Sequence, residues 1–295
     1  MAKHMLTAAA FVVLAGGLSA FAADSITAPP TELELDPFYK KYLDCDGITV
    51  IGSERVDDRA FYRLQELLDK MLAARPDLRE TLVDAGFRYI IIAHDEQVTD
   101  VPQYAHMKPR EFWNLRARGF GGRTTSCGEE NLLNLPVDRY SDESIFIHEL
   151  AHGIHSPGLR RCDPTFQDRL EALYDQAMDK GLYRYDYAAT NPAEYWAEGV
   201  QAFFDCDRQN NWNHNHVNTR EELIDYDPDM AAFIRDIFRI TDENDWRYEP
   251  LAEQPSVRSR EGDYHRLDRA LLDRLGQRLQ GQRSARRRHP ASDRH

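Results

Sequence analysis

The sequence predicts an α+β domain with a small mixed sheet, and three observations support this fold class. Residues 53–74 place apolar side chains three and four positions apart, as one face of a helix requires. Residues 88–93 form a short apolar run typical of a buried strand, and residues 48–51 can pair with it. Four more helices are expected at residues 164–179, 192–204, 220–226 and 228–238. Residues 23–250 suffice for one such domain and contain no internal repeat.

The two ends of the chain differ from this central part. Residues 1–22 have the form of a signal peptide, with Lys3 near the start, an apolar run, and a small-residue cleavage site at Ala20-Phe21-Ala22. That run is too short for a transmembrane helix, and no later segment is apolar enough to span a bilayer. We therefore expect a secreted or periplasmic protein without membrane insertion. Residues 251–295 form an Arg-rich tail, expected to be partly helical or disordered.

The charge of the chain limits its partners. The formal net charge is -13, although residues 251–295 hold 11 Arg against 6 acidic residues. The body that precedes this tail is therefore strongly acidic and would repel nucleic acids. We expect no nucleic-acid partner and a monomer. The acidity serves solubility or favours basic substrates.

Four cysteines follow the predicted signal peptide, and an exported protein can oxidise them. Three pairings are possible. We favour Cys45–Cys127 and Cys162–Cys206, because the second bridge would tie down the helix predicted at residues 192–204.

His148 and His152 carry the strongest functional indication, in the pattern His-Glu-x-x-His. Residues four apart lie on one face of a helix, so the two imidazoles can bind one zinc ion. Glu149 lies beside that face and can take a proton from metal-bound water. Apolar neighbours and a cap at Ser141 or Asp142 favour a helix here. We therefore expect a zinc site rather than an accidental match on a surface helix.

A catalytic zinc needs a third protein ligand. The metzincin pattern requires glycine at 155 and histidine at 158, whereas the chain has His155 and Gly158, so that class is excluded. As a ligand, His155 would lie about 10 Å along the helix from His148, which fits a tetrahedral ion poorly. We expect His155 to be a packed histidine or a residue lining the cleft.

Residues 191–204 predict a helix that carries two acidic residues. Asn191 is a good N-cap, and Pro192 suits the first helical position. Glu194 and Glu198 share one face of an otherwise apolar helix, where unpartnered carboxylates would be costly to bury. A metal ion with its histidine ligands would supply partners. From the pattern alone, the alternative that both acids are solvated on an outer face stays open.

The motif at residues 148–152, Tyr187 and the run at residues 190–198 together resemble the gluzincin catalytic domain of anthrax lethal factor and its relatives. The resemblance covers residues 140–205. It implies a zincin-like fold in which a helix with His-Glu-x-x-His is followed by a glutamate-bearing helix. It also implies one Zn²⁺ ion with Glu194 as third ligand, and Glu198 accepting an N–H from a ligand imidazole. Tyr187 would face the substrate and stabilise the oxyanion.

The function implied by this resemblance is that of a secreted zinc-dependent peptidase with Glu149 as general base, acting on peptides or proteins. We expect residues 130–135 to form the edge strand that pairs with substrate, as in gluzincins. Two alternatives stay open. One is a zinc hydrolase of a non-peptide amide such as a cell-wall polymer, and the other is an extracellular protein with a structural zinc only.

The loop at residues 212–218 carries two further histidines, His214 and His216. They could line the cleft and donate to a tetrahedral intermediate, or bind a second metal. Loop histidines usually do neither, so a purely structural role is the other interpretation.

Overall fold

The computed structural model describes residues 25–251, so the predicted signal peptide and nearly all of the Arg-rich tail lie outside the described residues. The described chain has four strands: β1 (Lys41–Cys45), β2 (Ile48–Gly52), β3 (Arg88–Ile92) and β4 (Thr124–Gly128). Its α-helices are α1 (Asp58–Leu72), α2 (Pro76–Asp84), α3 (Arg110–Arg116), α4 (Glu129–Leu132), α5 (Ile145–Ile154), α6 (Arg160–Cys162), α7 (Phe166–Asp179), α8 (Pro192–Phe203), α9 (Arg220–Tyr226) and α10 (Pro228–Phe238). None of the described helices is long and apolar enough to cross a membrane.

The sheet is small and mixed, in the order β1-β2-β3-β4. The hairpin β1-β2 is antiparallel, whereas β3 pairs in parallel with both β2 and β4. Each outer strand makes one additional antiparallel bridge, from Tyr42 to Thr27 and from Ser126 to Phe120. The predicted α+β class with a small mixed sheet is confirmed.

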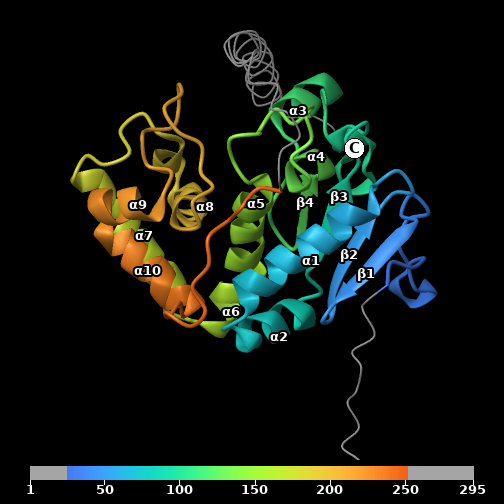
Figure 1. Cartoon of the computed structure of the whole chain (residues 1–295), viewed down its shortest axis with the longest axis horizontal. Coiled ribbons are helices and arrows are strands. Elements are labelled where there is room, and N and C mark those ends of the chain that lie inside the picture. The colour runs from blue at the N-terminus through green and yellow to red at the C-terminus, as the bar shows by residue number, and fades with distance from the viewer. Residues whose placement is uncertain (1–24, 252–295) are drawn as a thin grey trace, which may run out of the picture.

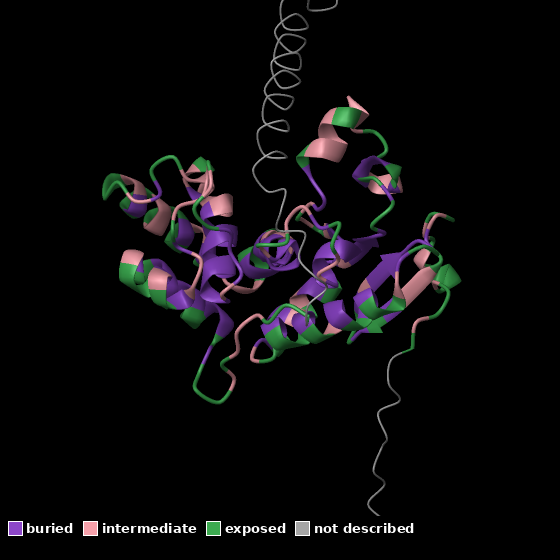
Figure 2. Cartoon of the chain, turned by 45° about the horizontal axis from the view of Figure 1, so that its top comes forward, coloured by how far each residue is buried: buried purple, intermediate pink, exposed green. Residues whose placement is uncertain are grey.

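Helix α5 lies in the middle of the molecule, between the sheet with α1 and α2 and a group of helices formed by α7, α8, α9 and α10 (Figure 1). It contacts β4 on one side and α8 on the other. Most of its residues are buried, as Figure 2 shows by colour. The two helices expected from the sequence to carry metal ligands, α5 and α8, therefore pack directly against each other.

The start of α5 differs from the prediction. The N-cap is Ser144, whose hydroxyl accepts from the backbone N–H of Ile147 at 3.3 Å, and not Ser141 or Asp142. Buried Asn131 fixes this point, because its Oδ1 accepts from Ile145 N at 2.8 Å and its Nδ2 donates to Asp138. The preceding residues are therefore held as a loop, and the helix begins later.

The predicted edge strand at residues 130–135 is wrong. Gly128 ends β4 and is also the N-cap of α4, so the chain passes directly from strand to helix. The strand nearest to α5 is β4, and the outermost extended residue beside it is Phe120. Residues 130–135 are too short a run for their apolar character alone to separate strand from helix.

The predicted disulfides are also wrong. Cys45 lies on β1 and Cys127 on β4, at opposite edges of the sheet. Three strand spacings of about 4.8 Å separate them, well beyond the reach of a disulfide. Cys162 and Cys206 are separate thiols: Cys162 Sγ contacts the Arg75 guanidinium, whereas Cys206 Sγ donates to the Gln201 carbonyl.

Candidate metal centre

The metal-binding atoms of His148 and His152 converge because the two residues lie one turn apart on α5. Their Nε2 atoms are 3.2 Å apart. Glu194 enters from α8, where the Asn191 side chain caps the helix by accepting from the backbone N–H of Ala193 and Glu194. Its Oε2 lies 3.1 Å from His152 Nε2 and 3.3 Å from His148 Nε2.

This geometry fits a zinc ion. Two ligand atoms that each lie about 2.1 Å from a tetrahedral zinc are about 3.4 Å from one another. The three separations between the Nε2 atoms and the Glu194 oxygen are close to this spacing. Two imidazoles and one carboxylate are also the donor set of many catalytic zinc sites. Within residues 25–251, no fourth histidine, cysteine or acidic side chain joins this group.

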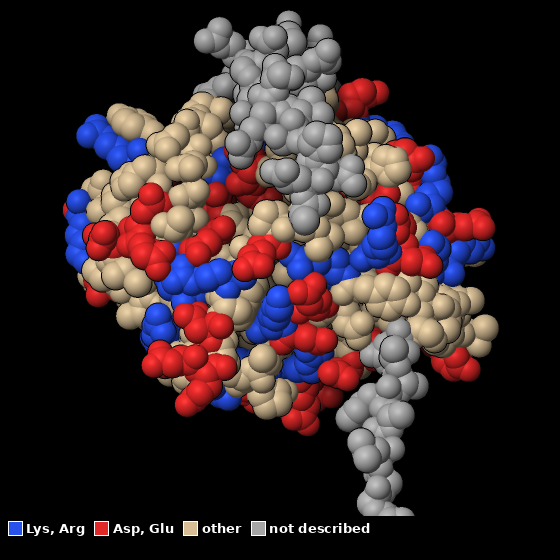
Figure 3. Space-filling view, in the orientation of Figure 1, with Lys and Arg blue, Asp and Glu red and all other residues tan. Residues whose placement is uncertain are grey.

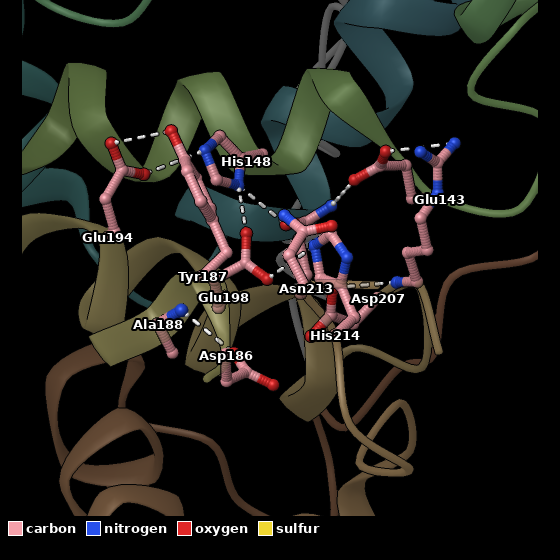
Figure 4. A network of polar contacts seen from close by, with 12 residues as sticks. Glu143, His148, Asp186, Tyr187, Ala188, Glu194, Glu198, Asp207, Asn213 and His214 are labelled. Atoms are coloured by element: carbon pink, nitrogen blue, oxygen red, sulfur yellow. Dashed lines mark hydrogen bonds and ion pairs between the residues drawn. The ribbon is translucent and has the colours of Figure 1, made fainter. Parts of the chain in front are cut away.

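The back of the His148 ring is held by two residues of α8. His148 Nδ1 lies 2.7 Å from Gln201 Oε1 and 3.3 Å from Glu198 Oε1. Gln201 uses its Nε2 to donate to the Ser144 carbonyl at 3.2 Å, so its oxygen must face the imidazole. Both contacts favour a proton on Nδ1, which leaves the Nε2 lone pair available for a metal. Figure 4 shows His148 between Glu194 and Glu198.

Glu149, the residue between the two histidines in the motif, is half-buried. The Gly119–Gly121 backbone lies against it. A Cβ added at Gly119 would lie 2.9 Å from Glu149 Cγ, and one added at Gly121 would lie 2.2 Å from His152 Cβ. Only glycine therefore permits this segment to approach the helix so closely.

Tyr187, in the short 3-10 helix Tyr187–Thr190, lies at the front of the cluster. Its hydroxyl donates to Glu194 Oε1 at 3.3 Å and accepts from Arg116 Nη2 at 3.0 Å. The structure thus places the Tyr187 hydroxyl beside the candidate ligand Glu194. The sequence pattern gave no indication of Arg116, which is separated from Tyr187 by 71 residues.

The charges of the cluster act on one another. Burial raises the pKa of Glu149, although the nearby His148 and His152 lower it, and the net shift is upward. Burial likewise raises the pKa of Tyr187 above its usual value. Burial would also raise the pKa of Glu194, but the contacts of its Oε2 with the Nε2 atoms of His148 and His152 hold this pKa well below its usual range. Glu194 is therefore an ionised carboxylate, as a metal ligand must be.

His214 lies behind the candidate ligands. Its Nε2 is 3.2 Å from Glu198 Oε2 (Figure 4), and its Nδ1 is 3.0 Å from Asn211 Oδ1. The side chain is only 9% exposed, so it is enclosed by protein. The structure places His214 against Glu198, where it supports the carboxylate that contacts His148.

Glu143, Asp207 and His214 form a second group whose polar atoms lie within 4.8 Å of one another. Arg208 Nη2 lies 3.2 Å from Glu143 Oε1, and the Arg208 backbone N–H donates to Asp207 Oδ1 at 2.7 Å. Burial raises the pKa of both acids. The Arg208 guanidinium therefore supplies positive charge next to Glu143 in this group.

The two remaining candidate histidines lie apart from the cluster. His155 begins the π-helical turn His155–Leu159, where its Nε2 contacts Gln167 Oε1 at 2.8 Å and its ring packs against Phe166. His216 is exposed and packs edge-on against Tyr226. Neither residue is brought to the His148–His152–Glu194 group.

No protein-family model matches the chain, and no curated protein matches it. Among solved structures, the chain is similar to the Pro-Pro endopeptidase PPEP-2 from Paenibacillus alvei, with a TM-score of 0.45 and 17% sequence identity. The match covers 65% of this chain and 98% of that chain. Similarity at this level does not identify a reaction, which has to come from the residues of the site.

Proposed function

We propose that the protein is a zinc-dependent peptidase. One observation carries the proposal: His148, His152 and Glu194 converge at zinc-ligand spacing, with Glu149 beside them and no fourth protein ligand among the described residues. A structural zinc closes its fourth position with another side chain, whereas a catalytic zinc leaves it for water or substrate. When bound, zinc would lower the pKa of a water molecule and polarise the substrate carbonyl.

The chain's own residues would handle the protons. Glu149 takes a proton from the attacking water and passes it to the leaving amine. The raised pKa of this half-buried carboxyl suits a group that must both accept and release a proton. Tyr187 supplies a hydroxyl donor to the oxygen on which negative charge develops.

The outermost extended segment beside the sheet supports an extended peptide as substrate. Phe120 and Ser126 exchange both backbone hydrogen bonds, at 3.2 Å and 2.8 Å. In an antiparallel pair, the residues on either side of such a pair direct their N–H and C=O groups the other way. Gly119 and Gly121 would therefore offer backbone groups beside Glu149 and His152, and an extended peptide would pair with them.

Export is proposed from the signal-peptide form of residues 1–22 alone. Sequencing the N-terminus of the protein after expression in a secreting host tests it, with Ala23 expected as the first residue. An N-terminus at Met1 in the extracellular fraction would contradict cleavage at this site.

The proposed function is tested by paired measurements on the wild type and Glu149→Gln. We expect one zinc per chain in both by elemental analysis, and cleavage of a random peptide library by the wild type only. Bound zinc without cleavage of any peptide by the wild type would favour a non-peptide amide or a structural ion. Full activity in Glu149→Gln would exclude Glu149 as general base.

A further inference from the structure

Arg116 ends α3 and reaches across to the candidate active site. Its Nη2 donates to the Tyr187 hydroxyl at 3.0 Å, and that hydroxyl donates to Glu194 Oε1 at 3.3 Å. A guanidinium has donors only, and a phenol has a single proton. The direction of both hydrogen bonds is therefore fixed, from Arg116 to Tyr187 to Glu194.

We propose that Arg116 is a positioning residue that holds the Tyr187 oxygen and polarises its O–H bond for catalysis. With the oxygen held from one side by a cation, the hydroxyl proton is free to turn from Glu194 toward the substrate oxygen as negative charge develops there. A donor that is itself hydrogen-bonded to a charged group becomes a stronger donor. The proposal rests on the peptidase function proposed above.

The backbone around Arg116 is held firmly enough for this role. Trp113, on the same helix, packs edge-on against Phe120 with ring centroids 6.0 Å apart. Asn114 Oδ1 accepts from Thr99 N at 3.1 Å, and the Tyr140 hydroxyl contacts the Arg116 carbonyl at 3.4 Å. Helix α3 is thereby attached to the segment that lies against Glu149 and His152.

The positive charge of Arg116 influences the part of the site that surrounds Tyr187. Arg116 Nη2 lies 3.0 Å from the Tyr187 hydroxyl oxygen, and Arg116 Cζ lies 5.9 Å from the centroid of the Tyr187 ring. The guanidinium thus favours negative charge on the face of the site that contains Tyr187. In a transition state, the substrate oxygen acquires negative charge on the same face.

The contact itself can be tested in the metal-free protein by NMR of tyrosines labelled with ¹³C at Cζ, with the Tyr187 signal assigned from Tyr187→Phe. Arg116→Gln should change the Tyr187 Cζ shift at neutral pH, because the donor to the Tyr187 oxygen is lost. Arg116→Lys should recover part of the change. Arg110→Gln removes an arginine of the same helix that pairs with Asp100, and should leave the signal unchanged. An unaltered Tyr187 signal in Arg116→Gln would overturn the proposal.

Kinetics separate positioning from substrate binding. Arg116→Gln should lower kcat by about tenfold with KM nearly constant, because Tyr187 would lose the donor that holds its oxygen. In the Tyr187→Phe background, the same substitution should have almost no further effect. Two results would overturn the proposal, because they would mean that Arg116 binds the substrate directly. One is a rise in KM with little change in kcat, and the other is an equal loss of activity in the wild-type and Tyr187→Phe backgrounds. A wild type inactive on all peptides would refute the proposed function and the catalytic role together, while the NMR shift would still report the contact.

Discussion

His148 Nδ1 lies closer to Gln201 Oε1, at 2.7 Å, than to Glu198 Oε1, at 3.3 Å. A neutral amide therefore shares with the carboxylate the task of orienting the ring. Gln201 is completely buried, and its Nε2 also donates to the Ser144 carbonyl, which belongs to the N-cap of α5. One side chain of α8 thus connects the orientation of a candidate ligand to the start of the helix that carries it.

Glu194→Ala should lose most of its zinc, because the two remaining histidines are too few to hold the ion tightly. Elemental analysis of protein dialysed against metal-free buffer measures this directly. Glu171→Ala, an exposed glutamate on α7, is the matched control and should retain one zinc per chain. Unchanged zinc in Glu194→Ala would reassign the third ligand.

His214→Gln should weaken zinc binding by about tenfold, because His214 supports Glu198 behind the candidate ligands. At saturating zinc, kcat should change little. A histidine that donated to the oxyanion would instead cost about 10² to 10³ in kcat. Zinc competition with a chelator and steady-state kinetics distinguish these results, with exposed His216→Gln as the control.

Gly121→Ala should reduce stability by about 1–3 kcal/mol and weaken zinc binding, because the new methyl group would overlap His152 Cβ. Chemical denaturation and zinc competition measure the two effects. Gly122→Ala separates crowding from backbone strain, since a Cβ there meets nothing within 4 Å although φ is +141°. If Gly122→Ala weakens zinc binding as much as Gly121→Ala, the crowding argument is wrong.

Asp138, which lies outside the candidate metal centre, should make the stability of the fold depend on pH. Burial raises its pKa from 3.8 to about 7, so the folded state holds a proton that the unfolded chain releases. The stabilisation from this proton is fully present below about pH 4 and is lost as the pH rises through about 7. The free energy of unfolding of Asp138→Asn, relative to that of the wild type, should therefore rise by about 2 kcal/mol between pH 5 and pH 7.5.

Urea denaturation of both proteins at the two pH values measures this change. The comparison cancels any constant cost of the amide, which meets the same donors, Asn131 Nδ2 and Tyr140 N. A difference in unfolding free energy that is independent of pH would show that the Asp138 carboxyl is ionised in the fold.

The elements predicted well from the sequence are those with strong local determinants. Helix α8 begins at Pro192 with Asn191 as N-cap, as predicted, because capping depends on neighbouring residues only. The apolar periodicity of residues 53–74 likewise identified α1, which is confirmed as Asp58–Leu72. Both histidines of the motif and Glu194 come together because regular helices fix which residues share a face.

The features that could not be predicted depend on distant partners. Gln201 lies 53 residues from His148, and Arg116 lies 71 residues from Tyr187, so no local pattern reports either contact. The cysteine pairing failed for the same reason, since spacing along the chain does not reveal that Cys45 and Cys127 lie on opposite edges of the sheet. The distribution of charge also depends on the fold: on the face drawn in Figure 3, acidic and basic side chains are interspersed.

Thr27 and Phe120, which bridge to the outer strands β1 and β4, also bear on solubility. Uncovered strands at a sheet's margin invite pairing between chains and lead to aggregation. Thr27 exchanges two hydrogen bonds with Tyr42, and Phe120 does so with Ser126. At each edge of the sheet, one residue of the same chain therefore already pairs with part of the exposed strand backbone. Edge-to-edge pairing of this sheet with that of another molecule is thereby disfavoured.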